Sequence, residues 1–481
     1  MNIQKTIVVG LLALLVFTTA CEDFLFQEPR LSQTNELTLS TYEGLQSATI
    51  GVYTPIYTSE WYGRDFVVTA DLKGGNAKKS PISSGRFEEE YLWNNTPQAS
   101  TNFWNVAYNV INRANNVLEV INAGFSEPGV EQEDLDQLAA ECQFLRGLAY
   151  FDLARMFCQP IAQGSGASQL GVPVVLTYEL GQPARNTLGE VFDQIEVDLV
   201  NAEKNLAVVS PNGGTDAKGW ATKPAAQALL ARYYLYVEDW KNAADYASMV
   251  INSGSYPIYT AEEYTTWDNG GVWGTDGASE IIFEVYGAEG NSGHSNWDVI
   301  SYIMSPEGYG DIAASLDVVN LYEDGDVRKA LFRNYEPNYV NHLWSLKYPG
   351  KAPDGNLRED NIPVLRISEM YLIRAEAILN GANVSGATAH DDLNMIRANR
   401  GASLLEAGNT TLTSVYQERR MELCFEGHQL FDLSRTGRPL VRVDYYGAVN
   451  QNIAFPDYRW AMPIPQAELD ANPNMEQNPD Y

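Results

Sequence analysis

Three glutamates at helical spacing are the first residues whose chemistry has to be decided. Glu418, Glu422 and Glu426 follow one another at intervals of four within "ERRMELCFEGHQ", so they share one face of a predicted helix. Two carboxylates at a set separation are what glycoside hydrolysis requires. The segments that would surround them also hold six arginines: Arg366, Arg374, Arg397, Arg419, Arg420 and Arg435. Because charges that face a helical core are retained mainly when paired, we predict a structural ion-pair network and no catalytic carboxylate.

The other polar motifs do not indicate a metal or nucleophilic site. The four histidines have no close ligand spacing, and the chain contains no Cys-x-x-Cys or His-x-x-x-His; the histidines are His294, His342, His390 and His428. We therefore expect no cofactor and no zinc. Two segments rich in acids and glycine, "DNGGVWGTDG" and "YEDGDVR", lack the spacing of an EF-hand loop. Surface turns explain them more simply, and a structural calcium ion stays open as the alternative.

Aromatic residues gather in one part of the chain. Residues 256–350 hold 16 aromatic residues and 11 glycines, about 17% aromatic against 11% for the whole chain. Exposed rings on glycine-punctuated loops can stack on sugar faces or hold peptide side chains. Buried packing is the default for tryptophan, so each ring alone is a hypothesis. The candidate ligand contacts in this region are Trp267, Trp273, Trp297, Tyr309 and Trp344.

Helices must position these segments, and for one helix the sequence predicts both the start and the buried face. In "TLGEVFDQIEVDLVNAEKNL", Thr187 and Glu190 form a capping-box signature at the start. The apolar residues then recur at helical spacing on one stripe, namely Val191, Ile195, Leu199, Ala202 and Leu206. The segment "AECQFLRGLAYFDLARMF" predicts a helix that pairs with this one.

The next segment predicts two helices joined by a tight turn. "ATKPAAQALLARYYLYVEDWKNAADYASMVI" turns near Glu238 and Asp239, and small residues at the crossing let the two backbones approach closely, as in helix-turn-helix repeats. The pair resembles a tetratricopeptide unit. Its tyrosines are expected in packing contacts and not at a ligand, as are Trp104 and Tyr108; those tyrosines are Tyr233, Tyr234 and Tyr236.

Further patterns extend the same architecture. "PVLRISEMYLIRAEAILNG" predicts a helix that ends at Gly381 and is followed by another around residues 393–397, and "SEIIFEVYG" predicts a strand with alternating faces. We predict a mainly α fold of tetratricopeptide-like helix pairs with a large irregular, loop-rich insertion and a few short strands. No linker divides residues 21–481, which we expect to form one domain: a helical scaffold over about 40–255 and 356–435, the insertion over about 256–355, and an irregular C-terminal segment, 436–481.

The N-terminus has the layout of a secretory signal. A short positive region, the apolar run from Thr6 to Phe17 and small residues precede Cys21, which resembles a bacterial lipobox. We expect residues 1–20 to be a lipoprotein signal peptide and Cys21 to carry the lipid; an ordinary signal peptide with an incidental cysteine is the alternative. No later run is long enough for a membrane helix.

Charge and cysteine content narrow the function further. The formal net charge is −30, and it becomes −31 without residues 1–20, because that segment holds Lys5 and no acid. Such a chain repels phosphate backbones, so nucleic acid is not an expected partner. The remaining cysteines, Cys142, Cys158 and Cys424, lie in apolar helical patterns and are expected to be free and buried.

Several motifs together resemble one family, the SusD/RagB surface lipoproteins that capture nutrients beside a TonB-dependent transporter. The motifs occur in order along the chain: "CEDFL", "YNVINRANNVLEVI", "FLRGLAYFDL", "IPVLRISEMYLIRAEAILN", "DLNMIRANRG", "ERRMELCFEGHQLFDLSR" and "PIPQAELDANP". Two departures, "FCQPIAQGSGASQLGVPVV" after the helix near 144–153 and Gln429 after His428, fall in scaffold segments.

The resemblance implies a SusD-like superhelix of four helix pairs that binds a ligand without catalysis. It implies a lipid-anchored, surface-exposed protein of the outer membrane that delivers an oligosaccharide or polysaccharide to a SusC-like transporter. In relatives the segment before the first helix pair contributes to the binding face, which adds Trp61, Tyr62, Trp93 and Asn94 to the candidates. A peptide receptor of the same uptake type is the first alternative. A glycan-active enzyme and a pure helical scaffold are the others.

Overall fold

The computed structural model describes residues 35–213, 217–265, 272–287, 297–335, 341–350, 356–357 and 359–481. Cys21 and Trp267 therefore lie outside the described residues. Contacts divide the chain after Ser47, and the packing and the sites below belong to the second unit, Ala48–Tyr481. Helix α2 (Asn35–Thr38) precedes this unit and α3 (Tyr42–Tyr53) crosses its start. Within the described ranges, no helix is both long and apolar enough to cross a membrane.

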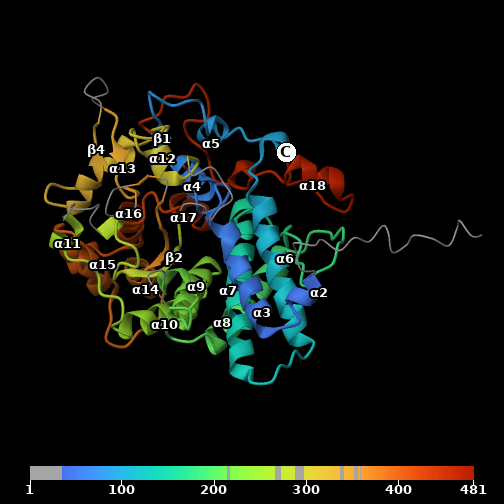
Figure 1. The fold of residues 1–481 in the computed structure, drawn as a ribbon. Coiled ribbons are helices and arrows are strands. Elements are labelled where there is room, and N and C mark those ends of the chain that lie inside the picture. Colours follow the sequence, from blue (N-terminus) through green and yellow to red (C-terminus); the bar gives the residue numbers. More distant parts are fainter. Residues whose placement is uncertain are drawn as a thin grey trace, which may run out of the picture. The chain divides into compact units, whose positions relative to one another are not determined.

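Long helices pack against their neighbours in chain order through the first half of this unit. Helix α7 (Gln132–Phe157) contacts both α6 (Phe103–Asn122) and α8 (Leu188–Asn205), as Figure 1 shows. Helix α9 (Lys223–Tyr236) likewise contacts both α8 and α10 (Trp240–Asn252). Each helix thus covers the apolar stripe of the one before it, which confirms the predicted mainly α fold of helix pairs.

The sequence signals of α8 are confirmed in detail. The Glu190 amide donates to Thr187 Oγ1 at 3.2 Å, and the Thr187 amide donates to Glu190 Oε2 at 2.8 Å, so the capping box is complete. The predicted stripe is buried from Val191 to Leu206. Helix α7 approaches this stripe closely at Gly147, where an added Cβ would lie 2.8 Å from Leu199 Cδ2.

The predicted turn between α9 and α10 is also confirmed. Glu238 adopts a left-handed conformation with φ of 59°, and the Asp239 side chain caps α10 by accepting from the Asn242 amide at 3.0 Å. The three tyrosines of α9 are buried, as expected. Trp104 and Tyr108 pack together with ring centroids 5.0 Å apart.

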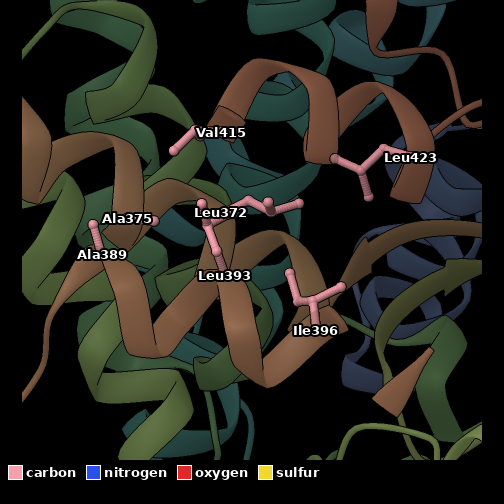
Figure 2. Packing of buried hydrophobic residues seen from close by; sticks show 7 residues of the cluster. All are labelled: Leu372, Ala375, Ala389, Leu393, Ile396, Val415 and Leu423. Atoms are coloured by element: carbon pink, nitrogen blue, oxygen red, sulfur yellow. The ribbon is translucent and has the colours of Figure 1, made fainter. Parts of the chain in front are cut away.

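A second group of helices follows the insertion. Helix α14 (Ile367–Leu379) packs against α10, α15 (Ala389–Asn399) and α16 (Leu412–Glu422), and α17 (Gln429–Arg435) contacts α4 (Asp65–Lys73). Figure 2 shows the apolar cluster where α14, α15 and α16 meet. Its seven buried residues are Leu372, Ala375, Ala389, Leu393, Ile396, Val415 and Leu423.

Three two-stranded antiparallel sheets involve the insertion, and two of them pair it with strands outside it. Strand β1 (Ala77–Lys79) pairs with β3 (Ile312–Ala314), β2 (Ile281–Val285) with β6 (Ile362–Arg366), and β4 (Phe332–Arg333) with β5 (Trp344–Ser345). The predicted strand β2 is present; all five of its residues are buried, and the register of its pairing shifts on either side of Phe283. Pairing of β2 with β6 joins the insertion to the segment that leads into α14.

Short elements complete the described part. The helices are α5 (Glu88–Leu92), α11 (Ala261–Thr265), α12 (Ile300–Met304), α13 (Leu316–Val319) and α18 (Gln466–Ala471). The 3-10 turns are η1 (Thr54–Tyr57), η2 (Pro97–Ala99), η3 (Gly166–Ser168), η4 (Ala217–Gly219), η6 (Val327–Leu331), η7 (Ala407–Asn409) and η8 (Tyr458–Trp460). Cys142, Cys158 and Cys424 are free and buried, which confirms the prediction for them.

Candidate functional site

Three aromatic rings form a partly exposed row around α12, and we call them the aromatic cluster: Trp297, Tyr302 and Tyr309. The Trp297 and Tyr302 centroids lie 5.1 Å apart at 81°, and those of Tyr302 and Tyr309 lie 5.0 Å apart at 72°. Trp297 is 48% exposed and Tyr309 is 37% exposed. Edge-to-face contacts of this kind hold each ring in place while ring surface remains open to a ligand.

Local structure explains why these rings meet. The other four residues of α12 are buried, which leaves Tyr302 as the one side chain of that helix that is partly exposed. The Tyr309 amide donates to the Tyr302 carbonyl at 2.8 Å, so the chain returns beside its own start. The return passes through Gly308, where an added Cβ would lie 2.4 Å from the Tyr302 carbonyl oxygen, and through Gly310 with φ of 59°. Both positions therefore require glycine.

A cation covers the end of the row. The Arg86 guanidinium lies 4.2 Å from the Tyr309 ring centroid and donates to Asp311 Oδ2 at 3.0 Å. The Asp311 side chain is fully buried, whereas that of Arg86 is 36% exposed. Arg86 is thus held on the ring by an internal carboxylate and keeps donors at the surface, where they could bind a hydroxyl or a carbonyl oxygen.

A polar cavity adjoins the cluster through the turn that joins Tyr302 to Tyr309. It encloses about 180 Å³ and is lined on one side by Ser305, Pro306 and Glu307. The other side carries Arg333 and Tyr335, with the Arg333 guanidinium 5.9 Å from the Tyr335 ring centroid. Ring faces beside donors and acceptors are what a sugar requires, because its two faces are apolar and its edge carries hydroxyl groups.

Four of the predicted ligand contacts are not part of this surface. Trp61 and Tyr62 are buried and stacked on each other, and Trp61 Nε1 donates to Asp152 Oδ2 at 2.8 Å. Trp93 is buried with its ring edge-on to Trp460 at 4.9 Å. Trp273 is 8% exposed and lies beneath the Lys347 ammonium at 4.7 Å. Internal partners cover these rings, so packing explains them and we no longer count them as contacts.

The remaining predicted residues divide in the same way. Trp344 is fully buried, and its Nε1 donates to the Gly310 carbonyl at 3.1 Å, so it supports the end of the Tyr309 turn from inside. Asn94 is exposed just beyond α5. Trp297 and Tyr309 alone among the described candidates present exposed rings. Tyr302 and Arg86 were missed: Tyr302 lies in a short, mostly apolar segment, and no sequence signal places Arg86 beside residue 309.

The three glutamates form ion pairs, which confirms the predicted network. Glu422 accepts from Arg400 Nη2 at 2.9 Å and from the Nη1 atoms of Arg328 and Arg366 at 3.1 Å each. Burial alone would raise the pKa of Glu422, but these three guanidiniums outweigh it and hold that pKa well below the usual range. The carboxylate is therefore held in its charged form by three partners, and a group in that state does not serve as a general acid.

The network is buried except at its edge, where Arg397 and Glu323 are partly exposed. Its six acids and five bases are joined by ion pairs of 2.5–3.1 Å: Glu280, Glu323, Asp326, Glu418, Glu422 and Glu426 with Arg328, Lys347, Arg366, Arg397 and Arg400. Of the six arginines named from sequence, only Arg366 and Arg397 belong to it. Arg374 and Arg435 pair instead with Asp392 and Glu376, both at 2.6 Å.

Metal chemistry finds little support in the same region. Among the residues that the structure describes, no group of three or more histidine, cysteine or acidic side chains could hold a metal ion. In "YEDGDVR", Asp326 pairs with Arg328 at 2.7 Å and Asp324 with Lys329 at 2.8 Å. His428 is buried, and its burial together with nearby arginines such as Arg232 holds its pKa well below the usual range.

Comparison with known proteins gives consistent similarities along the chain. Residues 23–235 match a family model described as "Starch-binding associating with outer membrane", and residues 329–481 match the model of the SusD family. A solved SusD superfamily protein from Bacteroides thetaiotaomicron is 30% identical with a TM-score of 0.82, over 91% of this chain and 100% of that one.

Two relatives extend the comparison. SusD-like protein P25 of Formosa agariphila is 24% identical over 98% of each chain. The starch-binding protein SusD of Bacteroides thetaiotaomicron is 30% identical over 179 residues, which is 35% of this chain and 32% of that protein. The full-length similarity extends to the segments that carry the aromatic cluster and the ion-pair network.

Proposed function

The chain belongs to the SusD family, and we propose that it captures a glycan at the cell surface and delivers it to a TonB-dependent, SusC-like transporter of the outer membrane. In this proposal Cys21 carries the lipid anchor and residues 1–20 are the signal that is removed. The protein binds and does not catalyse. The ligand is an oligosaccharide or a polysaccharide.

The aromatic cluster is the observation that carries the proposal. Two exposed rings, a third ring that holds them apart, and Arg86 at the end form a surface on which a sugar ring can stack and hydrogen-bond. The adjoining cavity at Ser305–Glu307 offers polar groups for a neighbouring sugar unit. Family membership supports the same reading, since one matching model describes starch-binding proteins and a relative is named a starch-binding protein.

Loss of one exposed ring tests the binding surface. We expect Trp297→Ala to weaken glycan binding about tenfold, because about 60 Å² of buried apolar ring face contributes about 1.5 kcal/mol. The measurement is a screen of residues 22–481 against polysaccharides and peptide digests, followed by calorimetry on the hits. Tyr309→Ala should act in the same direction.

The matched control is Tyr178→Ala, since Tyr178 is 44% exposed and lies in a loop that contributes no residue to the cluster. Binding of a polysaccharide that survives both Trp297→Ala and Tyr309→Ala would exclude the aromatic cluster as the site. Binding of peptides alone would favour the peptide receptor. Delivery is a separate step, tested by co-purification of the full chain with a SusC-like partner from outer membranes.

A further inference from the structure

A second cavity, distinct from the surface described above, lies between α3, η4 and β2. It encloses about 340 Å³ and shares no lining residue with the aromatic cluster or with the polar cavity beside it. Five aromatic side chains form most of its wall: Tyr53, Tyr57, Trp220, Phe283 and Tyr286. Ile50, which is 48% exposed, lines the same cavity on α3. The volume lies within the range of small-molecule sites, about 300–1,000 Å³.

The aromatic wall is fixed by contacts outside the cavity. The Tyr53 hydroxyl donates to Glu141 Oε2 at 2.8 Å and accepts from the Ala221 amide at 3.1 Å. The Tyr53 ring then meets Trp220 edge-to-face, with centroids 5.0 Å apart. Phe283 is buried and supported from behind by Phe144 at 5.1 Å. The cavity is therefore formed before any ligand enters, which lowers the cost of binding.

The residues that line the cavity limit the class of ligand that it can bind. None of the described residues that line the cavity carries a charge, so an ionised ligand would lose its hydration without gaining a counter-ion. A sugar is a poor fit, because its many hydroxyl groups would find few partners. A flat apolar molecule fits this lining.

The size fits two fused rings. A cavity of about 150 Å³ with an apolar lining holds one benzene molecule. This cavity has about twice that volume. We infer that it is a second ligand site, for an uncharged aromatic compound of about two rings. The site is independent of the glycan surface and does not depend on the proposed transport function.

The test uses 2-naphthol, which is uncharged at pH 7, and 2-naphthoate, which has the same rings and a negative charge. We expect calorimetry with residues 22–481 to show saturable binding of 2-naphthol and at least tenfold weaker binding of 2-naphthoate. Ile50→Trp fills the cavity from an exposed helix position and should weaken 2-naphthol binding at least tenfold.

The control is Met249→Trp, which adds the same side chain at a 50% exposed position on α10. It should bind 2-naphthol like the unmodified protein, and thermal unfolding of all variants checks that they fold. The inference is overturned if 2-naphthol shows no saturable binding, if Ile50→Trp binds it as tightly as Met249→Trp does, or if 2-naphthoate binds equally well.

Discussion

Glu422→Gln is expected to lower the free energy of unfolding by about 3–5 kcal/mol, the cost of breaking a buried ion pair by removing one partner. Three guanidiniums, those of Arg328, Arg366 and Arg400, lie within 3.1 Å of the Glu422 carboxylate. Glutamine has nearly the same shape, so packing is kept. The change removes the negative charge that these three guanidiniums share and leaves their positive charges less compensated in a buried region.

Urea unfolding of the two proteins measures the loss. Asp245→Asn is the control, because its ion pair with Lys241 is also short, at 2.6 Å, but its side chains are 42% and 79% exposed. Solvent screens such a pair, so Asp245→Asn should lower the free energy of unfolding far less than Glu422→Gln does. A loss below 1 kcal/mol for Glu422→Gln would contradict the network's role in stability. Turnover of a glycan by the unmodified chain that disappears in folded Glu422→Gln would support the enzyme alternative.

Lys73→Met is expected to change how stability depends on pH. Lys73 is 1% exposed, its Nζ lies 4.0 Å from the Trp93 ring centroid, and it donates to Asn95 Oδ1 at 3.3 Å. Burial lowers the pKa of Lys73 to about 7, although Glu90 acts in the opposite direction. The other charged groups that act on it are Arg459, Arg442 and Asp457.

The direction of this pH dependence follows from how many protons residue 73 binds in the folded and the unfolded chain. Between pH 7 and the pKa of an unfolded lysine, about 10.4, the unfolded chain binds more protons at residue 73 than the folded chain does, so stability rises with pH. From pH 7 to pH 9 the unmodified protein should gain about 2–3 kcal/mol relative to Lys73→Met. The measurement is urea unfolding of both proteins at the two pH values.

Lys329→Met is the control for Lys73→Met, since it makes the same replacement at a side chain that is 47% exposed. Equal pH dependence of Lys73→Met and the unmodified chain would show that residue 73 does not titrate in this range.

The helices could be read from sequence because their signals are local. The α8 cap depends on residues three positions apart, and the turn after α9 depends on Glu238 and Asp239 alone. The sequence predicted only some of the residues that belong to the ion-pair network. Arg328 lies 94 positions before Glu422, and Arg400 contacts it across a helix and a loop. Charged residues indicate that ion pairs must form, but they do not show which residues pair with each other.

The sequence predicted the kind of candidate site, but it did not predict which residues form it. Residues 256–350 do contain the exposed rings. Aromatic content alone could not separate Trp297, which is 48% exposed, from Trp344, which is 0% exposed. Tryptophan burial is decided by distant partners, as when Trp93 meets Trp460. The Arg86 contact with Tyr309 also depends on a distant partner, because it joins residues that are 223 positions apart.

The buried charges also change what an approaching polymer meets. In the part of the chain that the structure describes, 12 of the 32 lysines and arginines are buried, against 16 of the 62 acids. The exterior and the undescribed segments together therefore carry 46 acids and 20 bases, about 2.3 acids for each base against about 1.9 in the whole chain. Sulfated or uronic polymers are repelled at long range by such a field, most strongly in dilute salt, whereas neutral polymers diffuse in without an electrostatic barrier.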